Sequence, residues 1–486
     1  MPLIKQLNTN KFIMRERERN QTNMNSQHFL LISCTGQGHI NPTLQLAIRL
    51  IHGGAARVTF ATTVHGLKQI KKFPSLEGLS YASFSDGFDD GNKPIDDPQH
   101  IMSEFKRVGS QTLTNLIVKL SNDEHHKVTF LVYTILLPWA ADVARDMGIP
   151  SAFLCIQSTA ALAIYQKYFN AHDGMYHIYE NCPPNSIQFK GLPPFASSDL
   201  PSFLLPTSPP NPYLPSFQEL IQTLEKDPNP CVLLNTFDAL EEAAIEAVVN
   251  LNLIPIGPLV PSTFYDTKDQ SGSPFGCDLF ESSKDYLHWL NSKPNNSVVY
   301  VSFGSLVTLQ GKQMEEIFQG LVETDRPFLW VIRASVNGGS EIEDTIKNKL
   351  KEETQGLIVP WCSQVEVLCH HSVGCFLTHC GWNSTLESIV AGVPVVACPH
   401  FSDQIMNAKM VEEVWGTGIK AKMNEEEVVG RAEIKRCLEM VMGAAEKGEE
   451  IRRNAKKWKS LAVQAVKEGG SSHTHFKLFM ERFHID

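Results

Sequence analysis

The sequence predicts an α/β protein of two doubly wound, Rossmann-like domains that face each other across a cleft. The chain has 486 residues, which is too many for one ordinary hydrophobic core. Short apolar runs of strand length alternate with amphipathic segments of helix length, which is typical of a parallel sheet covered by helices. This alternation occurs twice, before and after the proline-marked connection IPIGPLVPS, so two domains of similar design are expected.

The first domain is expected over residues 27–254, because the alternation begins at His28. In chain order its predicted elements are a strand at 28–34, a helix at 42–52, strands at 57–63 and 128–134, a helix at 139–147, strands at 151–155 and 231–237, and a helix at 240–248. A proline-rich stretch, 182–215, can form neither regular sheet nor a long helix, so it should be a surface excursion.

The second domain is expected over residues 255–467 and repeats the pattern. Its predicted elements are a strand at 297–305, a helix at 313–321 and strands at 327–333, 357–360, 374–379 and 393–398. The segment EGGSS is a hinge-like break, after which residues 468–486 carry a final amphipathic helix. Facing α/β domains place the carboxyl ends of their strands on opposite walls of one cleft, where ligands of open α/β sheets bind.

Composition and charge exclude several classes of protein. The net charge of −10, from 43 basic and 53 acidic residues, argues against nucleic acid or an anionic membrane surface as a partner. No apolar run approaches the roughly eighteen residues of a membrane span. Eleven cysteines without a regular framework fit a reducing compartment, so we expect a cytoplasmic protein. We also expect a monomer.

The first 26 residues are expected to be a disordered tail, because they lack the central apolar block of a secretory signal. An organelle transit peptide is the alternative, although the segment holds two glutamates and only one serine. No metal site is expected either. Several cysteines and histidines lie within 362–380, but there is no C-x-x-C pair and their intervals fit no structural zinc site.

A predicted strand that runs directly into a helix carries the features of an anion site. Gly381, at the turn, permits close backbone approach, and Asn383 and Ser384 are both good N-cap residues. The first helix amides would point outward beside the positive end of the helix dipole, where a phosphate binds. Ser384 and Glu387 are also spaced as a capping box, so a purely structural role is the alternative for that pair.

The 44 residues from Trp361 to Gln404 resemble the signature box of plant UDP-sugar-dependent glycosyltransferases of family 1, which have the GT-B fold. The resemblance rests on side chains that helix capping leaves unexplained, namely Trp361, His379, Trp382, Asp403 and Gln404. It implies a uracil contact by Trp361 and the backbone of Cys362, ribose contacts by Gln364 and Glu387, diphosphate contacts by His379, Asn383 and Ser384, and sugar contacts by Trp382, Asp403 and Gln404. It also implies a final helix that crosses back onto the first domain, UDP-glucose as co-substrate, and no metal or other cofactor.

The first predicted strand ends in GQGHINP, where His39 lies between a glycine turn and the next helix. That helix is expected to begin with Asn41 as N-cap and Pro42 at its first position. A loop histidine is usually a solvated side chain. By the resemblance, His39 is instead the general base that takes the proton from an acceptor hydroxyl, so the anomeric carbon is inverted and UDP leaves.

Thr134 stands where most members of the resembled family carry the aspartate that orients this base. Its hydroxyl can accept a hydrogen bond from the imidazole ring, but it supplies no charge to an imidazolium. A weaker base is tolerable if the acceptor is acidic, such as a phenol or a carboxylic acid. Ser305, in VSFGS, is a candidate phosphate donor, with a plain turn serine as the alternative.

Two other classes of function could use the same residues. GQGHIN resembles part of a dinucleotide fingerprint, but the third glycine is missing and no acidic residue follows the second strand, which argues against a nicotinamide-dependent oxidoreductase. The missing carboxylate at Thr134 leaves a UDP-sugar-binding protein with little turnover as an alternative. The sugar contacts implied for Asp403 and Gln404 argue for an enzyme.

The sequence therefore predicts an inverting, metal-independent UDP-glucose O-glucosyltransferase that acts on a small lipophilic plant metabolite. The segments VYTILLPWAADVA and FSDGFDDG resemble the branch of anthocyanin and flavonoid 5-O- or 7-O-glucosyltransferases. A glucose-ester-forming transferase that acts on a phenolic, apocarotenoid or hormone acid is the alternative.

Overall fold

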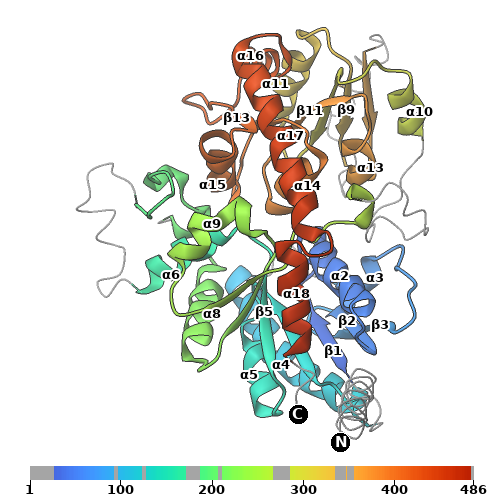
Figure 1. Cartoon of the computed structure of the whole chain (residues 1–486), viewed down its shortest axis with the longest axis vertical. Coiled ribbons are helices and arrows are strands. Elements are labelled where there is room, and N and C mark those ends of the chain that lie inside the picture. Colours follow the sequence, from blue (N-terminus) through green and yellow to red (C-terminus); the bar gives the residue numbers. More distant parts are fainter. Residues whose placement is uncertain are drawn as a thin grey trace, which may run out of the picture.

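The computed structural model describes residues 27–91, 97–122, 127–170, 187–205, 211–265, 285–333, 346 and 355–482. These residues form two lobes, each an open parallel sheet between helices, which confirms the predicted fold class (Figure 1). We call them the N-lobe, with strands β1–β7, and the C-lobe, with strands β8–β13. The expected tail, 1–26, and parts of the proline-rich stretch lie outside the described residues.

All neighbouring strands of the N-lobe sheet are parallel, in the order β3-β2-β1-β4-β5-β6-β7. The strands are β1 His28–Ile32, β2 Arg57–Thr63, β3 Leu79–Phe84, β4 Phe130–Thr134, β5 Ser151–Cys155, β6 Cys231–Leu234 and β7 Asn252–Pro255. The direction of winding reverses between β1 and β4. Loops that leave these two strands therefore diverge, which opens a crevice at their carboxyl ends.

Helices cover both faces of this sheet (Figure 1). They are α2 Gln37–His52, α3 Val64–Gln69, α4 Pro98–Leu120, α5 Trp139–Asp146, α6 Thr159–Asn170, α8 Leu214–Lys226 and α9 Asp238–Ala247, with short 3₁₀ turns η2 Ser197–Asp199, η3 Ser202–Leu204 and η4 Ser262–Phe264. β1 and β4 are buried along their whole length, as expected for central strands of a sheet that is covered twice.

The C-lobe sheet is also parallel throughout, in the order β10-β9-β8-β11-β12-β13. Its strands are β8 Val298–Ser302, β9 Phe328–Val331, β10 Gly356–Val359, β11 Val373–Thr378, β12 Val395–Ala397 and β13 Gly418–Lys420. Its helical segments are α10 Asp285–Asn291, α11 Gly311–Val322, α13 Gln364–Leu368, α14 Trp382–Ala391, α15 Gln404–Lys409, the π-helical η5 Met410–Val414, α16 Arg431–Met442 and α17 Glu446–Val466. Here the winding reverses between β8 and β11.

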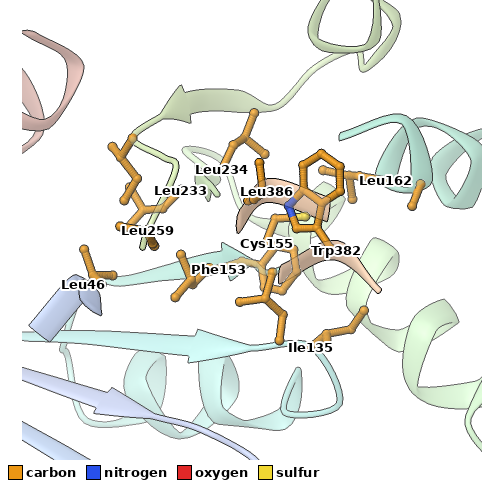
Figure 2. Packing of buried hydrophobic residues seen from close by; sticks show 14 of the residues in the cluster. Leu46, Ile135, Phe153, Cys155, Leu162, Leu233, Leu234, Leu259, Trp382 and Leu386 are labelled. Carbon is orange, nitrogen blue, oxygen red and sulfur yellow. The ribbon is translucent and has the colours of Figure 1, made fainter. Parts of the chain in front are cut away.

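The two lobes share one hydrophobic cluster. Figure 2 shows Trp382 and Leu386 of α14 packed among N-lobe side chains that include Phe153, Leu162 and Leu234. The indole N–H of Trp382 donates to the carbonyl of Asn235 in the N-lobe, at 2.9 Å. A buried indole N–H needs an acceptor, so this hydrogen bond favours the arrangement in which α14 packs against the N-lobe.

The last helix, α18 Ser471–Glu481, follows α17 but packs on the N-lobe (Figure 1). The ring of Phe479 lies 6.5 Å from that of Phe29 and 5.7 Å from that of Phe130, centroid to centroid. The guanidinium of Arg49 stacks on Phe476 at 4.6 Å. The end of the chain is thus part of the N-lobe core.

Several predicted element boundaries were wrong. α2 begins at Gln37 rather than at Pro42, with Gly36 as N-cap, so Asn41 is not a cap and His39 lies within the first turn. Pro42 is tolerated inside the helix because its missing N–H affects only one bond of an early turn. The edge strands β3 and β13 were not expected, and β7, not β6, is the last strand of the N-lobe sheet.

The structural alternative for Ser384 and Glu387, a capping box at the start of α14, is not formed. Gly381 is the N-cap and makes no side-chain cap bond, and Ser384 lies inside the first turn. Glu387 instead accepts a hydrogen bond from Gln364, at 2.6 Å. The helix does end at Gly392, whose φ of 71° is the left-handed conformation of a glycine C-cap.

Candidate active site

The candidate site is a cavity of about 550 Å³ between the carboxyl ends of the two sheets. It lies where both sheets reverse their winding, so the loops after β1 and β4 face the loops after β8 and β11. Of the predicted site residues, all but Thr134 line it: His39, Ser305, Trp361, Cys362, Gln364, His379, Trp382, Asn383, Ser384, Glu387, Asp403 and Gln404.

The predicted ribose contacts form one hydrogen-bonded group within the C-lobe. The side-chain N–H₂ of Gln364 donates to Ser384 Oγ at 2.9 Å and to a carboxylate oxygen of Glu387 at 2.6 Å. Tyr300 donates its hydroxyl to Gln364 Oε1 at 3.2 Å, which fixes the orientation of the amide. Burial raises the pKa of Glu387 to about 7. A pair of ribose hydroxyls could donate to that carboxylate.

Trp361 and Cys362 follow β10 and begin the loop that leads into α13. The indole of Trp361 is half-buried against the cavity, while the thiol of Cys362 is buried next to the hydroxyl of Tyr300, at 3.6 Å. A flat ring at the wall with backbone groups beside it can hold a nucleobase by stacking and by its edge. Only the backbone of Cys362 is suited to the second role.

The imidazole of His379 is held between two backbones. It follows β11, and a Cβ atom on Gly304 would lie 2.7 Å from its Nε2, while a Cβ atom on Gly381 would lie 2.6 Å from the same nitrogen. Burial lowers its pKa to about 3, and nearby His400 acts in the same direction. His379 is therefore a neutral hydrogen-bonding group at the amino end of α14, where the helix dipole favours an anion.

Trp382 and Asn383 open α14 and both reach across to the N-lobe. The indole N–H of Trp382 is engaged by Asn235, so its backbone amide is the polar group left for a ligand. Asn383 donates its side-chain N–H₂ to the carbonyl of Gly38 at 2.9 Å. Pro42, four residues after Gly38 in α2, has no N–H, so this carbonyl is free of its usual helical donor. Asn383 of the C-lobe thus donates the hydrogen bond that Pro42 cannot donate within α2.

Asp403 and Gln404 begin α15 and are both buried. The carboxylate of Asp403 accepts from Ser402 Oγ and from the amide of Asn407, each at 2.9 Å. Gln404 Oε1 accepts from the backbone N–H of His400 at 3.0 Å and of Phe401 at 3.2 Å. This leaves the N–H₂ of Gln404 to donate into the cavity. Together they offer an acceptor and a donor, as recognition of sugar hydroxyls requires.

His39 lies on the opposite wall, in the first turn of α2. Its Nδ1 is buried and has no hydrogen-bond partner among the described residues, so Nε2 is the nitrogen available to a substrate. Burial lowers the pKa of His39 to about 4. The side chain is therefore neutral at pH 7 and can accept a proton, but as a weak base.

Thr134 is not placed as predicted. Its side chain at the end of β4 is fully buried and does not line the cavity, and its hydroxyl has no partner within the part of the chain that is described. The predicted hydrogen bond from the His39 ring to Thr134 is therefore not formed. Because this hydrogen bond is missing, Thr134 does not oppose the effect of burial on the pKa of His39.

Ser305 lies at the cavity wall beyond β8, in a loop where the residue is half-buried. Its carbonyl and that of Val307 both accept hydrogen bonds from the guanidinium of Arg333. Arg333 thus holds the loop in place from the end of β9. The contact of Ser305 with a phosphate stays a prediction.

The comparisons with known proteins decide the family. A profile described as UDP-glucoronosyl and UDP-glucosyl transferase matches residues 277–457. Crocetin glucosyltransferase, chloroplastic, from Gardenia jasminoides is 53% identical, with 94% of this chain and 97% of that protein covered. The chain belongs to the plant UDP-glycosyltransferases. It is therefore an enzyme, a UDP-dependent glucosyltransferase of plant secondary metabolism.

Other relatives of this glycosyltransferase carry different acceptors in their names. Phloretin 4'-O-glucosyltransferase from Malus domestica is 50% identical, over 94% of this chain and 98% of the relative. Anthocyanidin 3-O-glucoside 5-O-glucosyltransferase 1 from Perilla frutescens is 45% identical, over 93% and 98%. The solved structure of Os79 from O. sativa in complex with UDP has a TM-score of 0.83 at 33% identity, with 94% of this chain and all of that one covered.

Several residues at the glycosyltransferase cavity were missed from the sequence. On the N-lobe side the cavity is also lined by apolar residues, namely Ile135, Leu136, Ile156, Phe203, Tyr213 and Phe217. Gln157 lines the same wall. It lies two residues after the end of β5, so the rule that ligands meet the carboxyl ends of parallel strands would have identified it. Phe203 and Tyr213 come from the proline-rich stretch, whose path no periodicity indicates.

Nowhere among the described residues do three or more His, Cys, Asp or Glu side chains gather as metal ligands would. Every helix within the described ranges is too short or too polar to cross a bilayer.

Proposed function

We propose that the enzyme is an inverting UDP-glucose O-glucosyltransferase, with His39 as general base and a flavonoid or anthocyanin hydroxyl at position 5 or 7 as acceptor. The observation that carries the proposal is the imidazole of His39, whose Nδ1 has no hydrogen-bond partner among the described residues, at the cavity wall opposite the C-lobe residues His379, Asp403 and Gln404. The acceptor oxygen attacks the anomeric carbon, the bond from that carbon to the β-phosphate oxygen breaks, and the proton passes to His39. UDP leaves with the electron pair of the broken bond.

The C-lobe holds the donor in this proposal. Trp361 stacks on the uracil and the backbone of Cys362 meets its edge, while Gln364 and Glu387 bind the ribose. His379, Ser384 and the first amides of α14 stabilise the negative charge that develops on the leaving diphosphate. Asp403 and Gln404 bind the glucose hydroxyls, with Ser305 as a further phosphate contact.

The weak base supports an acidic acceptor. With a pKa of about 4, His39 is poorly matched to an aliphatic hydroxyl, whereas a phenol, with a pKa of about 10, releases its proton far more easily. Phloretin and anthocyanidins, named for two relatives, are phenols. The apolar wall around Ile135, Phe203 and Phe217 suits their rings.

A carboxylic acid acceptor, which would yield a glucose ester, is the second candidate. The observation that favours it is that His39 has no carboxylate partner in the part of the chain that the structure describes, because a carboxylic acid is ionised at pH 7 and needs no base. Crocetin, named for the relative at 53% identity, is such an acid.

An acceptor panel with UDP-glucose tests both candidates through UDP release and product mass. We expect acceptor-dependent release with phenols, and a His39→Ala variant should lose about 100- to 10,000-fold in turnover. Its affinity for UDP, measured by calorimetry, should not change, because the nucleotide contacts belong to the C-lobe. Turnover of a phenol that survives His39→Ala contradicts the role of the base. With a carboxylic acid acceptor the same variant should retain most of its activity.

A further inference from the structure

We propose that Ser202 of the N-lobe is a positioning residue for the donor sugar, because it holds the backbone of Ser402 next to Asp403. The inference rests on the proposed function, in which Asp403 binds glucose hydroxyls. Ser202 begins the turn η3, in the proline-rich stretch for which the sequence indicated only a surface excursion. Ser402 belongs to the C-lobe, so the sugar end of the site includes a contact between the lobes.

The contact between the two serines is reciprocal. The backbone N–H of Ser202 donates to the carbonyl of Ser402 at 3.0 Å, and the backbone N–H of Ser402 donates to Ser202 Oγ at 2.7 Å. One residue of the N-lobe thus engages both polar backbone groups of Ser402. The second of these bonds depends on the Ser202 hydroxyl, so a side-chain substitution removes it.

The backbone of Ser402 has a conformation that needs such support. Its φ of 66° lies in the left-handed region, which a residue with a side chain adopts only at a cost in energy. A conformation of this kind persists where the surrounding structure holds it. The two hydrogen bonds to Ser202 provide that constraint. When one of them is lost, Ser402 can relax toward a negative φ, and its side chain then moves relative to Asp403.

The side chain of Ser402 carries the effect to the predicted sugar contacts. Ser402 Oγ donates to Asp403 Oδ1 at 2.9 Å, and Asn407 donates its side-chain N–H₂ to Asp403 Oδ2 at 2.9 Å. Each carboxylate oxygen is therefore held by one donor and can accept a further hydrogen bond from a sugar hydroxyl. Gln404 closes the same loop, since its Oε1 accepts from two backbone N–H groups that precede Ser402. A shift at Ser402 therefore displaces both sugar contacts.

The segment that carries Ser202 is anchored by other contacts as well. Asp199, three residues earlier, forms an ion pair with Lys409 of the C-lobe at 3.1 Å, and their side chains are only 13% and 12% exposed. Solvent and salt screen such a pair less than an open one. Directly after Ser202, the ring of Phe203 stacks on that of Phe217, with centroids 4.7 Å apart. A Ser202→Ala variant should therefore keep the segment in place.

The nucleotide half of the site is built differently. Gln364 donates to Ser384 and to Glu387, and all three residues belong to the C-lobe. Loss of the Ser202 hydroxyl should therefore weaken recognition of the sugar and leave recognition of UDP intact. If the serine pair did no more than join the lobes, its loss would affect the two ligands equally or affect neither.

The test compares the dissociation constants of UDP and UDP-glucose, measured by calorimetry on the full chain without acceptor. Ser202→Ala should leave the affinity for UDP unchanged and weaken UDP-glucose binding about fivefold, the size of one ordinary hydrogen bond. Ser202→Thr keeps the hydroxyl and should bind UDP-glucose like the wild type. Equal losses for both ligands in Ser202→Ala, or no loss for either, would overturn the inference.

Ser198→Ala is the matched control, because Ser198 lies in the same segment and is exposed. It should bind both ligands like the wild type. Asp403→Asn separates the two proposals. If it binds UDP-glucose more weakly while Ser202→Ala does not, the inference is overturned and the proposed function stands. If Asp403→Asn itself binds UDP-glucose like the wild type, the sugar contact and the inference fail together, whereas acceptor-dependent UDP release still tests the transferase.

Discussion

At the scale of single residues, the site combines groups that are fully partnered with groups that have no partner. Gln364 and Asp403 each have several hydrogen bonds, whereas His39 Nδ1 and the Thr134 hydroxyl have none within the described part of the chain. A buried hydroxyl without a partner costs stability, and a base without an acceptor for its second nitrogen is weakened. The residues expected to bind the donor are thus held in place by hydrogen bonds before a ligand binds, whereas the base expected on the acceptor side is not.

Thr134→Val tests whether this threonine contributes to catalysis. Valine has the same shape and removes a buried hydroxyl that has no hydrogen-bond partner among the residues described, so the free energy of unfolding should stay the same or rise by about 1 kcal/mol. Turnover should not change. Thermal denaturation and steady-state kinetics on the same preparation measure both. Lower turnover with an unchanged melting temperature would show that Thr134 does contribute to catalysis.

Glu387 should make donor binding depend on pH. Its pKa is raised to about 7, and ribose hydroxyls bind its ionised form, so affinity for UDP-glucose should fall about tenfold as pH drops from 8 to 6. UDP-glucose is the suitable ligand because its diphosphate does not titrate in this range. His39 and His379, whose pKa values are lowered to about 4 and about 3, do not titrate there either.

Glu387→Gln is the control for that titration. It keeps the shape and removes the ionisation, so its affinity should be weaker at pH 8 and independent of pH. Calorimetry at several pH values decides, and an equal slope in the variant and the wild type would assign the titration to another group.

At the scale of elements, the loops that follow β1, β8 and β11 carry the site because both sheets reverse their winding there. The loop after β8 shows how tightly these loops fit. Gly304 has a φ of 71°, a conformation that suits glycine, and the His379 imidazole lies against its backbone. The position of His379 therefore depends on a residue that has no side chain.

Gly304→Ala should displace His379. The added Cβ would lie 2.7 Å from the imidazole, and the left-handed backbone alone costs about 1–2 kcal/mol. We expect a lower melting temperature and weaker binding of UDP, but little change for uridine, which lacks the diphosphate. Gly469→Ala, another positive-φ glycine with open space around it, controls for backbone strain. Equal losses for uridine and UDP would mean that the variant disturbs the whole lobe.

At the scale of the whole molecule, the lobes are joined by a common hydrophobic cluster and by specific polar contacts. Trp382 and Trp415 of the C-lobe donate their indole N–H groups to the N-lobe carbonyls of Asn235 and Leu240, at 2.9 and 3.0 Å. Asp199 of the N-lobe forms ion pairs with Lys409 and Lys420. The final helix α18 returns to the N-lobe core. The arrangement of the cavity is thus a property of the joined lobes.

The sequence by itself determined the fold class, the central strands and the grouping of the donor box. Those features depend on local periodicity and on residues close in the chain, such as Gln364 and Glu387, which one strand-helix unit brings together. Edge strands such as β3 were not predicted, because most of their residues are half-buried and the sequence shows no clear pattern of apolar residues there.

Only the tertiary structure decided the contacts between lobes. The bond from Asn383 to Gly38 and the bond from Ser158 to Asn407 join residues far apart in the chain, and the burial of Thr134 away from the cavity was likewise not foreseen. The physical reason is that a side chain's free polar atoms are known only once its neighbours are placed. The sequence alone shows that Pro42 cannot donate a hydrogen bond within α2. Which group donates to the carbonyl of Gly38 instead depends on how the two lobes pack together.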